Sequence, residues 1–132
     1  MKALSIKEPY ATLIVKGIKK IETRSYKTNY RGPLLIHASK SKVENDVLAN
    51  KDLASFYDID ELSYGGIIGK CEIVDCVYMD EKFLEEIKKH KVEYICGDYK
   101  LGRYAWILDK VEKLEMIPVR GSLGLWNYDF DK

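Results

Sequence analysis

Residues 17–24 read GIKKIETR and hold the densest chemistry of the chain. The glycine stops a helix, two lysines follow, and the remaining residues alternate as in a strand. Because strand side chains point to alternate faces, Glu22 and Arg24 share one face. The planar guanidinium of Arg24 can donate to a phosphate or to a base edge. Glu22 can accept a hydrogen bond from a base amino group or hold the Arg24 side chain, and Lys19 supplies a point charge. The pattern predicts a polar ligand site, and the alternative is a solvated surface pair of Glu22 with Arg24.

The segments on either side of this stretch predict the elements that frame it. Pro9 at a first helical position, followed by apolar residues on one face, predicts a helix of about two turns that stops at Gly17. Residues 20–27 then form a strand with one apolar and one polar face. Residues 33–38 are apolar except for His37, as expected of a strand buried on both sides. His37 is expected to be a hydrogen-bonded core residue, with ligand contact as the less favoured alternative.

The rest of the chain alternates short helices with strands of mixed length. The first half of this region is predicted to contain a helix opened by a Ser41–Glu44 capping box, a helix end and surface loop over 50–64, and a strand from Gly65 and Gly66 onward. A helix capped by Asp80 and a loop over 94–102 follow. Residues 103–108 and 111–119 are predicted as two strands or one bent strand, and the tail is predicted to pack back on the body. Simple alternation places Ile67, Cys71 and Ile73 on one face. Mixed strand lengths without a regular βαβ rhythm indicate an α+β fold with a curled antiparallel sheet or a small barrel.

Length and composition indicate one globular domain over residues 1–132. The chain has 46% apolar and 33% charged residues, and a chain of this length forms a core without disulfides or a structural metal. No apolar run approaches the ~18 residues that a membrane span needs, and the first residues contain no apolar signal stretch. We therefore expect a cytoplasmic protein without membrane contact.

The cysteines and histidines do not form a metal-binding pattern. Cys71, Cys76 and Cys96 contain no CxxC pair, and the histidines are His37 and His90. The spacing of these cysteines and histidines therefore does not match that of zinc, haem or iron–sulfur ligands. Reduced thiols are expected, and neither a metal nor a cofactor is predicted.

The formal net charge of +1 hides an asymmetry along the chain. Residues 1–42 contain ten Lys and Arg against two acids, a net of +8, whereas residues 43–132 contain 12 basic and 19 acidic residues, a net of −7. The molecule is therefore expected to be electrically polarised, and a polyanion would approach the N-terminal third. Simple solvation of a lysine-rich face is the alternative.

The stretch at residues 17–24 resembles the ASCH domain family, a group of small PUA-like proteins whose hallmark is Gly-x-Lys-x-x-Glu-x-Arg. Gly17, Lys19, Glu22 and Arg24 match its four fixed positions. The resemblance extends over essentially the whole chain. It includes LSIKEPYA at residues 4–11, YRGPLLIHA at 30–38, and PVRG at 118–121 followed by LGLW at 123–126.

The resemblance implies a PUA-like small β-barrel decorated with short helices, with a cleft beside the motif that takes RNA, a nucleotide or a modified nucleoside. The ligand-binding residues would be Lys19, Glu22, Arg24, Tyr26, Arg31, Ser122 and Trp126. Tyr26 or Trp126 would stack on a base, because aromatic and basic side chains are the usual means of gripping single-stranded RNA. For Trp126, packing against the body is the alternative. The identity of the ligand and the oligomeric state stay open.

Two other functions are compatible with the resemblance. Some ASCH proteins are amidohydrolases that act on N4-acetylcytidine with a Lys, a Thr and a Glu, and others are linked to RNA cleavage. A metal-independent hydrolase of either kind would use Lys19, Glu22 and Glu72 as catalytic residues, but Glu22 stands at the position of the amidohydrolase Thr. Thr23 is expected to point to the opposite face. A protein-interaction module in transcription or translation regulation is the third reading, and it would use exposed apolar area rather than a polar cleft.

Overall fold

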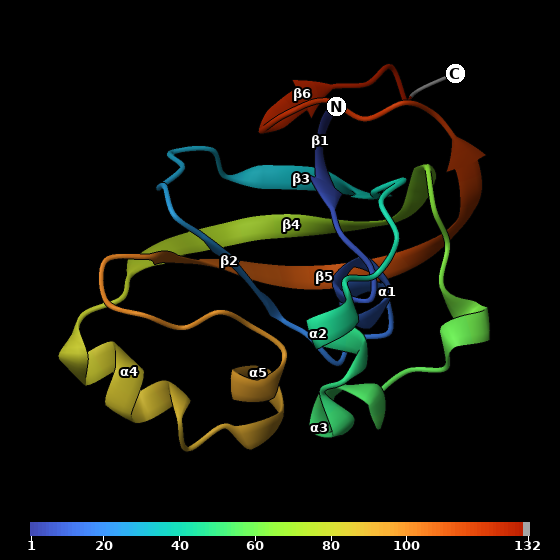
Figure 1. The fold of residues 1–132 in the computed structure, drawn as a ribbon. Coiled ribbons are helices and arrows are strands. Elements are labelled where there is room, and N and C mark those ends of the chain that lie inside the picture. The colour runs from blue at the N-terminus through green and yellow to red at the C-terminus, as the bar shows by residue number, and fades with distance from the viewer. Residues whose placement is uncertain (131–132) are drawn as a thin grey trace.

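A computed structural model describes residues 1–130 of the chain, and Figure 1 shows their arrangement. In these residues six strands form one curled sheet, and short helices lie around it. The elements are β1 (Lys2–Ile6), α1 (Tyr10–Val15), β2 (Ile21–Arg24), β3 (Gly32–Ala38), α2 (Asn45–Leu48), α3 (Lys51–Ala54), a 3-10 turn (Ile59–Glu61), β4 (Gly66–Tyr78), α4 (Glu81–Ile87), α5 (Lys91–Ile95), β5 (Tyr104–Pro118) and β6 (Leu125–Asn127).

The sheet has the strand order β2-β5-β4-β3-β1-β6. β1 and β3 run parallel, whereas the other neighbouring strands are antiparallel. β4 and β5 are long strands that cross the whole body, and Figure 1 shows the chain after β5 curling back to β6 beside the N-terminus. The fold is an α+β half-barrel, which confirms the predicted fold class.

The main core lies between α1 and one face of the sheet, because the apolar side of α1 packs against β3, β4 and β5. Its fully or nearly fully buried members include Leu4, Ala11, Ile14, Leu34, Ile36, Cys71, Ile73 and Trp106. Trp106 also donates its indole Nε1 hydrogen to the carbonyl oxygen of Tyr26 at 3.1 Å. Trp106 lies in β5 at the position that pairs with Glu22 of β2, and Ile21 of β2 packs in a separate cluster that contains Met79 and Ala105.

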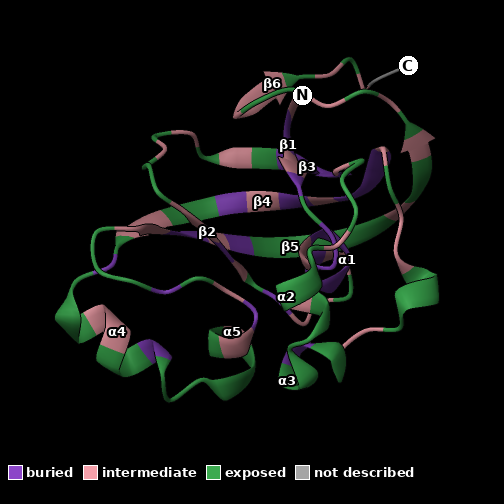
Figure 2. Ribbon diagram, viewed as in Figure 1, coloured by how far each residue is buried: buried purple, intermediate pink, exposed green. Residues whose placement is uncertain are grey.

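β3 is buried on both faces, as its apolar sequence predicts. Leu34 and Ile36 enter the main core, whereas Leu35 packs on the other face against the C-terminal segment that contains Trp126 and Phe130. Figure 2 shows buried residues along the strands at the centre and exposed residues over α2, α3 and most of α4. The helices other than α1 are therefore peripheral to the sheet.

α1 ends where Gly17 adopts a φ of +79°, a left-handed conformation that glycine takes without strain. The Gly17 N–H bonds to the carbonyl oxygen of Ile14 at 2.9 Å, and the N–H groups of Ile18 and Lys19 bond to that of Leu13 at 3.0 and 3.1 Å. The predicted helix stop is confirmed. The turn directs Lys19 back toward α1.

The predicted capping box at Ser41 and Glu44 is wrong. Glu44 is the residue before α2, but its side chain makes no capping bond and instead forms an ion pair with Lys7 at 2.7 Å. The segment over 50–64, predicted as a helix end and surface loop, contains α3 as a separate helix, which Asn50 caps by accepting from the Leu53 N–H at 3.1 Å.

The prediction that Ile67 shares a face with Cys71 and Ile73 is also wrong. The pairing of β4 with β5 shifts register between Ile67 and Gly69, and such a bulge interrupts the alternation of side chains. Ile68 therefore packs in the main core with Cys71 and Ile73, whereas Ile67 packs on the opposite face of the sheet.

Several predicted boundaries move. The segments predicted over 103–108 and 111–119 form one bent strand, β5, which spans Tyr104–Pro118 and in which Lys110 has a φ of 53°. β2 ends at Arg24 rather than at residue 27, and the predicted loop over 94–102 begins inside α5. The tail packs back as predicted but also contributes a strand, because β6 pairs with β1.

No helix within residues 1–130 has both the length and the apolar character needed to cross a membrane. Cys71 and Cys96 are buried, Cys76 is half-buried, and all three are free thiols. Burial raises the pKa of the Cys71 thiol to about 12, so this group is inert at neutral pH.

Candidate functional site

Lys19 is a fully buried cation that follows α1. Its Nζ donates to the carbonyl oxygen of Cys96 at 2.6 Å and lies 3.8 Å from Glu22 Oε1. It also stands 5.5 Å from the centre of the Tyr10 ring, within cation–π range. Burial lowers the pKa of Lys19, while the carboxylates of Glu22 and Glu93 act in the opposite direction. The cost of burying the ammonium group is offset by these specific partners.

Glu22 joins the two cations of the motif. Its Oε2 accepts from Arg24 Nε at 2.9 Å and lies 2.8 Å from Arg24 Nη2, while its Oε1 faces Lys19. Arg24 Nη2 also donates to the carbonyl oxygen of Ser5 at 3.1 Å, and the guanidinium carbon stands 6.0 Å from the Trp106 ring centre. The Glu22 side chain is 9% exposed and that of Arg24 is 22% exposed. Arg24 is therefore the accessible end of this row of charges.

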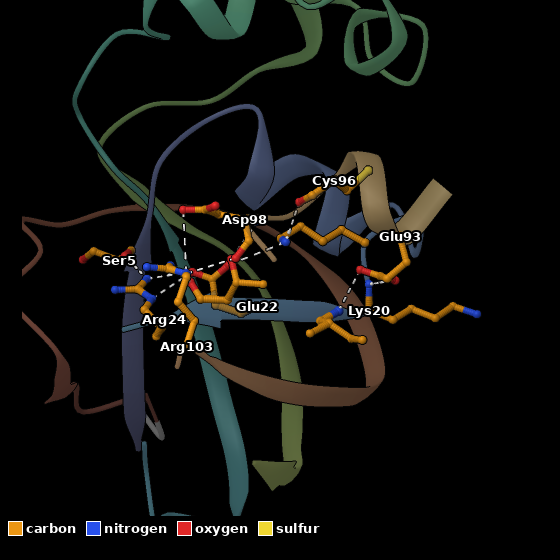
Figure 3. A network of polar contacts seen from close by, with 11 residues as sticks. Ser5, Lys20, Glu22, Arg24, Glu93, Cys96, Asp98 and Arg103 are labelled. Atoms are coloured by element: carbon orange, nitrogen blue, oxygen red, sulfur yellow. Dashed lines mark hydrogen bonds and ion pairs between the residues drawn. The ribbon is translucent and has the colours of Figure 1, made fainter. Parts of the chain in front are cut away.

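The backbone of β2 is fixed by residues that are distant in sequence. The Glu93 carboxylate accepts from the N–H groups of Lys20 and Ile21 at 2.8 and 3.1 Å. Thr23 Oγ1 accepts from the N–H of Asp98 at 3.1 Å. Figure 3 shows Glu93 and Asp98 close to the motif residues. The segment from α5 to residue 98 therefore holds the motif strand in place.

Lys19, Glu22 and Arg24 line one cavity of about 550 Å³, called the motif cavity below. Its other lining residues include Ser5, Lys7, Tyr10, Asp98, Arg103 and Ser122. The cations of the lining outnumber its carboxylates, and the volume is in the range of small-molecule sites. The cavity thus combines fixed hydrogen-bonding groups with an excess of positive charge.

Four of the predicted site residues meet at this cavity: Lys19, Glu22, Arg24 and Ser122. Ser122 is exposed and belongs to the segment between β5 and β6. The strand and the C-terminal segment are therefore brought together from opposite ends of the chain.

Three predicted binding residues are not among those that line the cavity. Tyr26 is 43% exposed and packs edge-on against Trp106, with ring centres 5.5 Å apart. Arg31 donates to two carbonyl oxygens of its own loop at 2.9 and 3.0 Å. Trp126 is half-buried and donates its Nε1 hydrogen to Ser5 Oγ at 3.2 Å. The structure thus gives each of them a partner within the protein, and for Trp126 that partner is a lining residue of the motif cavity.

The residues considered for catalysis are also separated. Glu72 does not line the motif cavity, and its Oε2 lies 3.7 Å from Lys110 Nζ. Thr23 borders the cavity, but its hydroxyl oxygen is engaged by the N–H of Asp98. Lys19 and Glu22 are therefore the catalytic candidates that the fold places together.

His37 is 2% exposed and hydrogen-bonded at both ring nitrogens. Its Nδ1 lies 3.0 Å from Ser5 Oγ, and its Nε2 lies 2.7 Å from the carbonyl oxygen of Val119. The prediction of a hydrogen-bonded core histidine is confirmed.

The sequence did not predict that residues 96–98 and Arg103 line the motif cavity together with the motif. The carbonyl of Cys96 binds Lys19, and Arg103 Nε donates to the carbonyl oxygen of Asp98 at 3.0 Å. In the sequence, Gly97 was the residue that could have indicated this contact, because a Cβ there would lie 3.1 Å from Thr23 Cγ2. A glycine in such a loop indicates close approach of another segment, but it does not say which one.

The family model of the ASCH domain matches residues 4–118 of this chain. The match contains the whole motif and most of the sheet, and the chain belongs to the ASCH domain family. The resemblance stated from the sequence is therefore confirmed, and the half-barrel is the PUA-like fold of that family.

The chain is similar to Activating signal cointegrator 1 of Homo sapiens, with 26% identity, and of Mus musculus, with 25% identity. Each alignment covers 96% of this chain but 22% of the relative. The chain thus spans about a fifth of the length of these curated relatives. The ASCH domain family is associated with RNA or nucleotide interaction in general.

Proposed function

We propose that residues 1–132 act as one ASCH domain that binds RNA or a nucleotide in the motif cavity. The observation that carries this proposal is the convergence of Lys19, Glu22 and Arg24 on one cavity with an excess of positive charge. Positive charge and fixed planar donors are what phosphate and base recognition require. The general association of the family with RNA or nucleotides supports the same conclusion.

The contacts suggest a division of roles within the motif. Glu22 already accepts from Arg24 and faces Lys19, so its role is to orient the guanidinium rather than to read a base. Arg24 is the more exposed cation and presents its remaining edge to the ligand. Tyr10 is the aromatic residue among the described lining residues, and it supplies the apolar surface for a base in place of Tyr26.

Binding of single-stranded RNA is expected to weaken with salt. Cationic side chains that contact phosphates release counterions, so two or three such contacts reduce affinity about tenfold between about 50 and 200 mM salt. Fluorescence anisotropy with a labelled random-sequence RNA hexamer measures this change. An affinity that is equal at both salt concentrations would count against the proposal.

Metal-independent hydrolysis is a second candidate, and one observation favours it. Lys19 is a buried group with a lowered pKa at a cavity, and such groups are concentrated at active sites. Against it, Lys19 Nζ is held by the Cys96 carbonyl, and Glu22 replaces the hydroxyl nucleophile of the related amidohydrolases. A water activated by Glu22 is the remaining route to hydrolysis.

Release of acetate from N4-acetylcytidine is expected to be low or absent, because Glu22 is engaged by two cations and no hydroxyl stands in its place. The assay measures acetate with purified protein and with the variants Lys19→Ala and Glu22→Gln. Rapid turnover that is lost in both variants would establish the hydrolase instead of the binding module. Turnover that survives both substitutions would place the active site elsewhere.

A further inference from the structure

We propose that the motif cavity is one half of a longer groove, and that the ligand is a single strand of at least two nucleotides rather than a free nucleoside. This inference rests on the proposed function and narrows its ligand. A second cavity of about 560 Å³, called the basic lobe below, is lined by residues that include Ser5, His37, Lys40, Arg120 and Gly121.

The two cavities are adjacent and share part of their lining. Ser5, Ser39, Ser122 and Leu123 line both of them, so a ligand that fills the motif cavity borders the basic lobe directly. Each volume is sufficient for a small polar ligand, and the shared wall offers hydroxyl groups that can donate to sugar or phosphate oxygens. The geometry therefore favours an extended ligand over a compact one.

The charges of the two halves differ. Lys40 and Arg120 are the charged residues among the described lining of the basic lobe, and both side chains are exposed. The motif cavity also contains the carboxylates of Glu22 and Asp98. A lobe with cations alone suits a phosphate, whereas a lobe with both signs suits a base edge with donors and acceptors. A nucleotide strand presents these two chemistries in alternation.

Ser5 links the two halves. Its carbonyl oxygen accepts from Arg24 in the motif cavity, while its hydroxyl is held by His37 Nδ1 at 3.0 Å and Trp126 Nε1 at 3.2 Å. The backbone opposite is Gly121, where a Cβ would meet Ser5 Oγ and lie 2.7 Å from His37 Cε1. The absence of a side chain at Gly121 therefore lets this backbone approach Ser5 and His37 closely, which holds the segment that carries Arg120 and Ser122 against β1 and β3.

Leu123 is an apolar residue placed at the junction of the lobes. It is 99% exposed and lines both cavities. A fully exposed apolar side chain contributes nothing to the packing of the described fold, but it can cover the face of a base or a sugar. Its position indicates that the ligand passes over the junction rather than ending there.

The test compares ligand length with the integrity of the basic lobe. A labelled random-sequence RNA hexamer is measured by anisotropy, and a mixture of the four nucleosides and a mixture of dinucleotides compete with it. The proteins are the wild type, Lys40→Ala/Arg120→Ala, and the control Lys82→Ala/Lys88→Ala, which removes the same charge from an exposed position in α4 and from the exposed residue that follows α4. A thermal melt of each variant confirms that it is folded.

We expect dinucleotides to compete better than nucleosides. The Lys40→Ala/Arg120→Ala variant should lose about tenfold in affinity for the hexamer, because each lost phosphate contact weakens strand binding. Its affinity for nucleosides, which have no phosphate, should stay unchanged. The control variant should match the wild type within about twofold.

Four results would overturn this inference. Nucleosides that compete as well as dinucleotides would limit the ligand to the motif cavity. Equal losses for short and long ligands in the Lys40→Ala/Arg120→Ala variant would show that the basic lobe does not distinguish a strand from a single nucleoside. Both of these results would leave the proposed function intact. A hexamer affinity unchanged in that variant would exclude the basic lobe. Absence of binding by every ligand in the wild type would overturn the proposed function together with this extension of it.

Discussion

Lys19→Met is expected to lower the free energy of unfolding by about 3 kcal/mol, the low end of the cost of breaking a buried ion pair. The substitution keeps the bulk of the side chain but leaves the Cys96 carbonyl without its donor. It also leaves the Glu22 carboxylate, which is 9% exposed, with Arg24 as its remaining cation. The loss stays at the low end because Arg24 still neutralises Glu22.

Chemical denaturation of wild type and variant measures this difference. Lys20→Met is the matched control, because the neighbouring side chain is exposed and its removal should change stability by less than about 0.5 kcal/mol. In the double variant Lys19→Met/Glu22→Leu both buried charges are removed, so the combined loss should be smaller than the sum of the single losses. A Lys19→Met protein as stable as the wild type would show that the free-energy cost of desolvating the Lys19 ammonium group equals the stabilisation from its contacts.

Arg24→Ala is expected to weaken RNA binding about tenfold to a hundredfold, the range for one bidentate arginine contact. Arg24 is the motif cation with an exposed edge, and Glu22 and Ser5 hold its guanidinium in a fixed orientation at the cavity. A pre-oriented fork loses less entropy on binding, so its removal costs more than removal of an ordinary surface charge.

The comparison that isolates this effect uses two further variants. Lys2→Ala removes one charge from the same +8 segment outside the cavity, and its affinity should change by less than about twofold. Arg24→Lys keeps the charge but loses the fork, and an intermediate affinity is expected. Equal losses for Arg24→Ala and Lys2→Ala would reduce the role of Arg24 to general electrostatics.

The sequence predicted the fold class and the face shared by Glu22 and Arg24, because both depend on local periodicity. The helix stop at Gly17 and the buried strand with His37 follow from local rules in the same way. Details that depend on strand pairing were not predicted. The bulge that separates Ile67 from Ile68 and the pairing of β6 with β1 arise from contacts between distant segments.

Apart from Ser122, the lining of the motif cavity was predicted only as far as the motif extends. Lys19, Glu22 and Arg24 belong to one short segment, so their proximity follows from the sequence. The Cys96 carbonyl and Glu93 come from residues more than seventy positions later, and neither backbone atoms nor a helix-borne carboxylate give a pattern that points to the motif. Tyr26 shows the opposite error, since its spacing placed it on the motif face but the strand ends at Arg24.

Ligand-induced chemical-shift changes in a ¹⁵N-labelled sample test the central claim most directly, because they report which backbone amides respond to RNA. Titration with a random-sequence RNA hexamer is expected to shift the amides of residues 19–24, 96–98 and 121–124, which line or support the motif cavity. Shifts confined to another surface, such as residues 109–116 of β5, with the amides of residues 19–24 unchanged, would contradict the assignment of the motif cavity as the binding site.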